Sequence, residues 1–185
     1  MQTTPAQALD NPFWAFSLKV YGAEGVADEC LALQERLGLD VNLLLFAAYI
    51  GAVEGVTLDA RDIAGAAGAV SAWHDDMVRA LRGVRRSLKP LSLDARNPLR
   101  AAAADLRAQV KGAELEAEKI EQTMLWQWSR ANLGARAHGD GGAALAANLH
   151  AVLAHYGAGG GTGESGAALQ LQAAALACAA SKSGP

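Results

Sequence analysis

The sequence predicts an all-α protein: a compact helical bundle of about six to seven helices with one long helix and a flexible Gly-rich C-terminal tail. The first observation is composition, because 42 of 185 residues are alanine and only 5 are proline, a balance that favours helix over sheet. The second is the spacing of apolar residues, which recur at intervals of three and four. The third is a set of well-placed helix start and stop residues. We expect residues 1–156 to form a single helical domain, and residues 157–185 to form a Gly/Ala-rich linker and tail.

The N-terminal third predicts three helices. Asn11 and Pro12 have the form of an N-cap and a first helical position, and they begin a helix over 12–21. A second helix over 24–37 places one apolar stripe on a single face before Gly38 ends it. A third, over 41–54, is apolar nearly all round and should be the central helix.

The middle third predicts two more helices. One begins after Asp59, and the next begins at Ser71 and stops at Pro90, with a loop over 90–96. The second of these is strongly amphipathic. Its apolar stripe, expected to face inward, is Trp73, Met77, Leu81, Val84 and Leu88.

The last third predicts the long helix, over 98–130, with apolar residues or alanines in heptad-like spacing that suits packing within a bundle. A short helix follows over 143–156. Residues 157–166 read as a flexible Gly-rich linker, and residues 167–180 are helix-prone.

Charge is distributed unevenly along the chain. Residues 1–76 carry a net charge of −8, residues 77–107 a net charge of +6 and residues 108–185 a net charge of −1. The strongest surface feature is a basic stripe on one helix, which could bind phosphate groups or an acidic protein surface, or be neutralised within the fold. Its members are Arg79, Arg82, Arg85, Arg86 and Lys89, with Arg96 and Arg100 across the loop.

Two clusters of potential metal ligands lack the spacing of a metal site. The run Trp73-His74-Asp75-Asp76 has adjacent residues, which do not share one helix face. Glu114, Glu118 and Glu121 do share a face, but the Glu-x-x-His pairs of di-iron bundles are missing, and Lys111 and Lys119 indicate charge pairing on an exposed face. We therefore expect no metal and no cofactor.

Two further patterns concern the cysteines and tryptophans. Cys30 and Cys178 are far apart and outside any CxxC spacing, and residues 1–10 lack the features of a secretion signal, so we expect a cytoplasmic protein with reduced thiols. Trp126 and Trp128 differ by about 200° around a helix, which leaves one of them as a candidate exposed contact.

Three segments near the N-terminus resemble a known family. They are FWxFSLxVY at residues 13–21, CLxLQ at 30–34 and DVNLLLF at 40–46, and the similarity continues through Trp73, residues 81–89 and residues 115–118. The chain resembles, over about residues 12–125, a family of short bacterial proteins known as a domain of unknown function. The resemblance implies a compact helical cytoplasmic protein and assigns no catalytic role.

Two functional hypotheses follow. The first is a non-enzymatic interaction or regulatory protein whose basic stripe binds an anionic partner, either an acidic protein or a phosphate-bearing ligand; nucleic acid fits less well because the stripe lacks interleaved aromatic residues. No membrane partner is expected, and the oligomeric state stays open. The alternative is a small enzyme or ligand-binding protein with a pocket between the N-terminal helices. That pocket would be lined by Trp14, Tyr21, Tyr49, Trp73 and His74.

Overall fold

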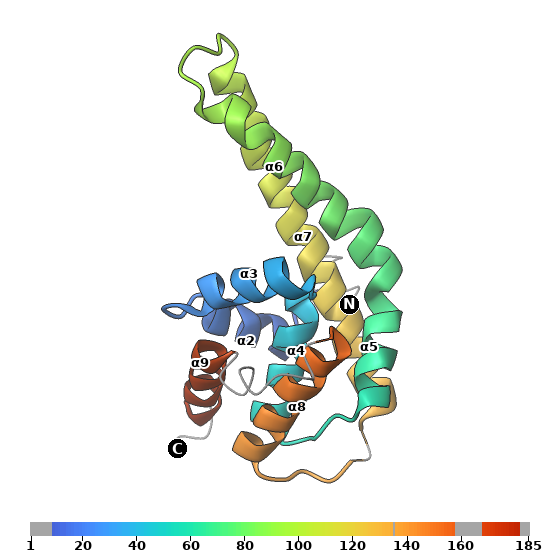
Figure 1. Ribbon diagram of the computed structural model, residues 1–185. Coiled ribbons are helices and arrows are strands. Elements are labelled where there is room, and N and C mark those ends of the chain that lie inside the picture. The colour runs from blue at the N-terminus through green and yellow to red at the C-terminus, as the bar shows by residue number, and fades with distance from the viewer. Residues whose placement is uncertain (1–8, 135, 158–167, 182–185) are drawn as a thin grey trace, which may run out of the picture. The chain divides into compact units, whose positions relative to one another are not determined.

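The computed structural model describes residues 9–134, 136–157 and 168–181 (Figure 1). Every regular element in this part of the chain is a helix, so the all-α prediction is confirmed. No helix among these residues has both the length and the apolarity needed to cross a bilayer. The Gly-rich linker predicted at 157–166 lies, except for Gly157, outside the described residues.

The elements follow the predicted order closely. The bounds are α2 (Pro12–Tyr21), α3 (Val26–Leu37), α4 (Val41–Ala52), α5 (Ala60–Trp73), the π-helix η1 (His74–Arg79), α6 (Ala80–Leu93), α7 (Arg100–Asn132), α8 (Gly141–His155) and α9 (Leu169–Ala180). The predicted long helix is α7.

The chain divides into two compact units. Unit 1 comprises Met1–Ala69 and Gln122–Pro185, and unit 2 comprises Val70–Glu121. Helices α5 and α7 each contribute residues to both units. The domain boundary expected at residue 156 stays a prediction.

Two helix boundaries in the middle of the chain were predicted wrongly. Ser71 does not begin a new helix, because α5 runs through it to Trp73 and continues directly into η1. Pro90 does not end α6, which extends to Leu93. A proline removes one backbone donor but has a helical φ, and here only one further turn follows, closed by the Asp94 N–H donating to the Pro90 carbonyl at 3.0 Å.

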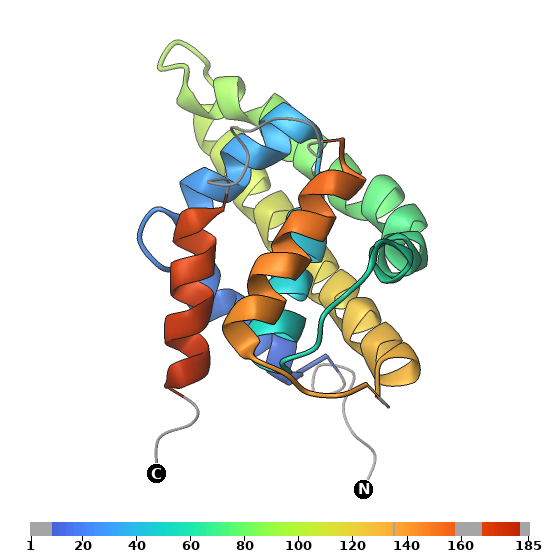
Figure 2. The ribbon, with the colours of Figure 1, turned by 60° about the horizontal axis from the view of Figure 1, so that its bottom comes forward.

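The core of unit 1 is α4, as the sequence predicts. Every residue from Asn42 to Gly51 is buried, and α2, α3, α8 and α9 all pack against this helix (Figure 2). The approach to α8 is the closest, because a Cβ on Gly51 would lie 2.5 Å from the Cα of Leu145. Glycine at this position is therefore what allows the two backbones to come together.

Asn148 of α8 connects the same helix pair to the segment after α4. Its side-chain oxygen accepts the Leu58 N–H at 2.7 Å, and its amide donates to the carbonyls of Ala47 and Val56 at 3.2 and 2.9 Å. Asn148 is fully buried, so these bonds satisfy backbone groups that water does not reach.

An aromatic cluster packs around α4 in unit 1. Tyr49 lies in edge-type contact with Phe16 and with Trp126, with ring centroids 5.4 and 5.8 Å apart, and Phe46 contacts Trp128 in the same way. The two tryptophans therefore both reach α4, and neither belongs to the exposed class. The expectation that one of them is exposed is wrong, because an indole ring is large enough to reach inward from the flank of a helix as well as from its inward face.

The helix-prone C-terminal segment is α9, and it packs onto unit 1. It contacts α2, α3, α4 and α8. Its first turn is held by Glu29 of α3, whose two carboxylate oxygens accept the backbone N–H groups of Gln170 and Leu171 at 3.1 and 2.9 Å. A carboxylate at a helix N-terminus both satisfies free donors and interacts well with the helix dipole.

Gly51→Ala should destabilise unit 1 by about 3 kcal/mol, because the new methyl group meets backbone atoms that cannot rotate away. Gly68→Ala on α5 is the matched control, since a Cβ there meets nothing within 4 Å. It should stabilise the protein by about 0.5–1 kcal/mol. Chemical denaturation measures both changes, and equal midpoints for the two variants would contradict the close α4–α8 approach.

Glu29→Ala should loosen α9. Loss of the cap costs about 1 kcal/mol, so amide hydrogen exchange within residues 169–180 should become about fivefold faster. Glu35→Ala, which removes an exposed carboxylate from the same helix, should leave that exchange unchanged. Identical exchange in both variants would show that Glu29 does not hold α9.

Candidate functional site

Unit 2 is an antiparallel pair formed by the end of α5, η1 and α6 on one side and the first part of α7 on the other (Figure 1). All five residues of the predicted basic stripe belong to this pair, as do Trp73 and His74. The remaining residues of the alternative pocket, Trp14, Tyr21 and Tyr49, belong to unit 1. The pocket they were expected to line together stays a prediction.

The Arg–Glu cluster joins α6 to α7 and consists of Arg82, Arg85, Glu114 and Glu118. Arg82 donates from Nε to Glu114 at 3.0 Å and from Nη2 to Glu118 at 2.7 Å. Arg85 donates to both oxygens of Glu114, from Nε and, at 3.2 Å, from Nη2. Arg85 thus holds Glu114 in forked geometry, and Arg82 adds one more charged hydrogen bond to the same carboxylate.

The cluster corrects two interpretations of the sequence. Glu114 and Glu121 were expected on an exposed face, but both are buried. Arg82 and Arg85, taken as part of an outward stripe, point toward α7 and are largely covered. The physical reason is that the arginines of α6 are better partners for the glutamates of α7 than the lysines of α7 itself are.

The electrostatics of the two glutamates differ. Burial by itself raises the pKa of Glu114, but hydrogen bonds and charges from Arg85 and Arg82 outweigh it and hold that pKa below its ordinary value. For Glu118, burial raises the pKa above its ordinary value, and attraction to Arg82 only partly opposes this. Burial lowers the pKa of the Arg82 guanidinium, but its bonds to Glu114 and the charge of Glu118 bring it above its ordinary value. Glu114 is therefore the anion on which the cluster depends.

The π-helix η1 changes which residues of this segment face inward. A π-helical turn closes hydrogen bonds to the fifth residue instead of the fourth, so it shifts the phase of the residues that follow. Val78 is fully buried, whereas Met77 and Val84, both predicted to be on the inward stripe, are exposed. The predicted inward direction is wrong for these two residues because α-helical spacing was assumed throughout.

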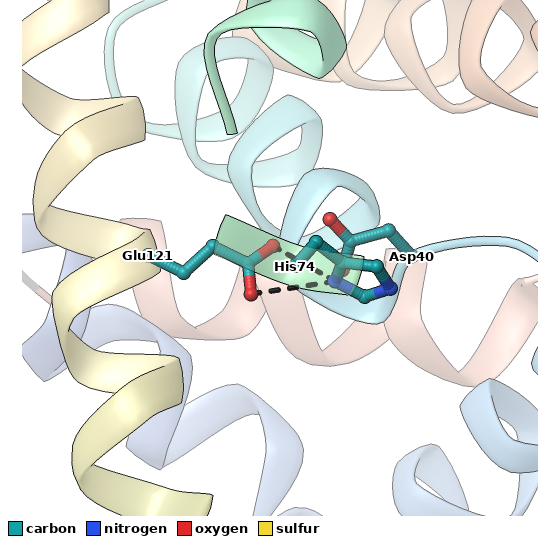
Figure 3. Close-up of side chains that lie close together, drawn as sticks. All are labelled: Asp40, His74 and Glu121. Atoms are coloured by element: carbon teal, nitrogen blue, oxygen red, sulfur yellow. Dashed lines mark hydrogen bonds and ion pairs between the residues drawn. The ribbon is translucent and has the colours of Figure 1, made fainter. Parts of the chain in front are cut away.

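His74 and Glu121 form the second polar contact of unit 2. The Nδ1 atom of His74 lies 3.1 and 3.4 Å from the two carboxylate oxygens of Glu121 (Figure 3). Trp73, one residue earlier, donates its indole N–H to the Ala117 carbonyl at 2.9 Å. These bonds tie the end of α5 and the start of η1 to α7, at the end of the pair away from the connecting loop.

Imidazole and carboxylate are both metal-ligand types, so His74 and Glu121 are the part of unit 2 with that chemistry. In this structure the pair links η1 to α7 through the contact between the imidazole and the carboxylate.

The other basic residues of unit 2 are placed differently from Arg82 and Arg85. Arg79 pairs with Asp75 at 2.8 Å on the exposed surface. Arg86 and Lys89 on α6 and Arg100 and Lys111 on α7 are exposed, and no acidic partner among the described residues pairs with them. Arg107 is partly covered, and its Nε atom is buried without a hydrogen-bond acceptor. We call these five residues, Arg86, Lys89, Arg100, Arg107 and Lys111, the basic face.

Helical spacing places the basic face on one side of the pair. Arg86 and Lys89 are three apart on α6, and Arg100, Arg107 and Lys111 follow each other at seven and four on α7, so each set forms one stripe. The sequence pattern identified the α6 members. It also placed Arg100 across the loop from them. It did not group Arg107 and Lys111 with the stripe, because both are diluted among alanines in a helix of 33 residues.

Glu114→Gln should destabilise unit 2 by about 2 kcal/mol at pH 7, because two guanidinium groups lose their charged partner. The folded-state pKa of Glu114 is lowered, so its contribution is complete above the ordinary value of 4.5 and is lost as the pH falls through the lower folded value. The difference between the variant and the unmodified protein should therefore vanish in acid. Thermal unfolding at a series of pH values measures it.

Glu116→Gln, at an exposed position on the same helix, is the control and should change stability by less than about 0.5 kcal/mol. Glu118→Gln should cost less than Glu114→Gln, because burial already disfavours the charged form of Glu118. A Glu114 variant as stable as the Glu116 variant would show that the Arg–Glu cluster does not hold the pair together.

Comparison with known proteins identifies a family. The family described as "Protein of unknown function (DUF2390)" matches residues 12–125, which is more than half of the chain and includes α2 to α6 and most of α7. No curated protein and no solved structure matches the chain. The chain therefore belongs to the DUF2390 family.

Proposed function

We propose that this protein is a non-enzymatic interaction or regulatory protein, and that the basic face of unit 2 binds an acidic surface of a partner protein. The observation that carries the proposal is the division among the cations of unit 2. Arg82 and Arg85 are neutralised by Glu114 and Glu118, whereas the basic face keeps its charge.

The charge of unit 2 supports this proposal. Within residues 86–111 there are six basic side chains and two acidic ones, Asp94 and Asp105. Asp94 is paired with Arg96 at 3.3 Å in the connecting loop. A local excess of positive charge in a chain with a net charge of −3 attracts anionic partners and speeds their association.

An acidic protein fits the basic face better than single-stranded nucleic acid does. Proteins that bind single strands combine cations with aromatic side chains on which bases stack. The sequence of residues 80–121 contains no Phe, Tyr or Trp. The guanidinium and ammonium groups of the basic face can each accept a carboxylate without an aromatic platform.

A cytoplasmic location, expected from the sequence, is part of the proposal. The two cysteines are free and buried, and burial raises the pKa of the Cys30 thiol to about 12, which keeps it protonated and unreactive. Free, protonated thiols are consistent with a reducing compartment.

The double variant Arg86→Glu/Lys111→Glu should weaken binding of a fluorescently labelled glutamate-rich peptide by at least about tenfold, since each reversal removes an attraction and adds a repulsion of up to about 1 kcal/mol. Fluorescence anisotropy at low and physiological salt measures it, and the affinity of the unmodified protein should fall with salt. Arg82 is left intact because its reversal would place a glutamate against Glu114 and Glu118.

The control is Arg36→Glu/Arg61→Glu, which makes the same charge change at two exposed positions of unit 1. It should leave peptide binding within about twofold. Equal losses in the two double variants would show attraction to net charge only, and would overturn the proposal. Tighter binding of single-stranded RNA than of the peptide would replace it with a nucleic-acid interface.

A further inference from the structure

Unit 2 exposes large apolar side chains in a regular pattern. Val84 and Leu91 on α6 are 50% and 52% exposed. Leu99, directly before α7, and Leu106 within it are 69% and 48% exposed. In each pair the two residues are seven positions apart, so they lie on the same side of their helix. These four side chains are not scattered single residues but two rows.

Both rows lie on one side of the helix pair. On α6 the half-buried side chains of Leu81 and Leu88 point toward α7. Val84 follows Leu81 by three positions and precedes Leu88 by four, and Leu91 follows Leu88 by three. On α7 the same relation holds between Leu99 and Leu106 and the half-buried Ala103 and Val110. Equal rotational offsets in antiparallel helices place the two exposed rows on the same side.

Small residues line the outer edge of each row. Ala80 and Ser87 on α6 and Ala102 and Ala113 on α7 are exposed. A Cβ added to Gly83, beside this edge, would meet nothing within 4 Å. Large side chains next to small ones form the knobs and holes that let a further helix approach closely.

We define the apolar face as Val84, Leu91, Leu99 and Leu106 together with Ala80, Ser87, Ala102 and Ala113. It contains no charged residue. It lies on the opposite side from the basic face, because Arg86 is two residues, or about 200°, from Val84, and Lys111 is five residues, or about 140°, from Leu106. The basic face and the apolar face therefore lie on opposite sides of the pair.

We propose that the apolar face binds the apolar face of a second copy of this chain, so that two helix pairs form an antiparallel four-helix bundle. Helices that contact two neighbours carry a wide apolar arc, and α6 has such an arc from Leu81 and Leu88 to Val84 and Leu91. Helix α7 covers only one end of it.

A second copy fits this face for two reasons. A two-fold interface presents the same patch from both sides, so it must be compatible with itself, and an uncharged face satisfies this without any like-charge contact. The alternation of large and small residues is likewise present on both helices, so each copy supplies both knobs and holes.

The size of the face sets the strength of the dimer. The face extends over residues 80–91 of α6, about 17 Å, and residues 99–113, about 21 Å, and two packed helices are about 20 Å wide, which gives about 400 Å² in projection on each copy. Because protruding side chains add surface to this flat projection, the accessible area that two such faces bury comes close to 1,200 Å², about the lower end of stable interfaces. We therefore expect a dimer that dissociates reversibly in the micromolar range.

Sedimentation equilibrium of the full chain over a concentration series tests the proposal. The unmodified protein should pass from monomer to dimer, and Leu106→Glu should shift the dissociation constant by at least about a hundredfold, because each copy would bring a buried unpaired charge to the interface. Leu106 is already half exposed, so the variant should fold, and circular dichroism checks this. Leu106→Gln, which adds no charge, should weaken the dimer in the same direction.

The matched control is Leu115→Glu. Leu115 is on the same helix, 47% exposed, and nine residues from Leu106, which places it on the opposite side of α7. This variant should dimerise like the unmodified protein. A monomer at every concentration up to about 1 mM, or equal effects of the two glutamate variants, would overturn the proposal. Arg86→Glu/Lys111→Glu should still dimerise, which separates failure of this proposal from failure of the basic-face function.

Discussion

Unit 2 depends on the ion pairs that the carboxylate of Glu114 forms with two arginines. Because this carboxylate accepts from both Arg82 and Arg85, it fixes how α6 is turned about its own axis when it packs on α7. That orientation directs Val84 and Leu91 to one side and Arg86 to the other. A buried ionic contact that stabilises modestly can still select one arrangement of two helices among several with similar apolar contact.

Much of the fold could be predicted from the sequence, and the reasons are local. Asn11 and Asp40 cap α2 and α4 through their own side chains, and the all-apolar composition of α4 can only be satisfied in a core. The errors at Ser71 and Pro90 are also local. Ser71 is typical of a helix start and Pro90 of a helix end, but a continuous helix accommodates each at a small cost in stability that the sequence does not display.

The candidate site was only partly predictable, because it depends on contacts between distant segments. The sequence identified five basic residues on one helix, but not that two of them face Glu114 and Glu118 some thirty positions later. It also gave no sign of η1, since no residue type marks a π-helical turn and its effect is a shift of phase. The exposed rows on unit 2 become visible only once the direction of α7 is known.

The opposite placement of the basic and apolar faces has a consequence for valency. If two copies join through their apolar faces, the two basic faces point outward on opposite sides of the bundle, and one assembly carries two equivalent anion-binding surfaces. Such a particle can bridge two acidic partners, or grip one partner that displays two acidic segments with an avidity above that of either contact alone. The concentration of the protein would then regulate how tightly it holds its partner.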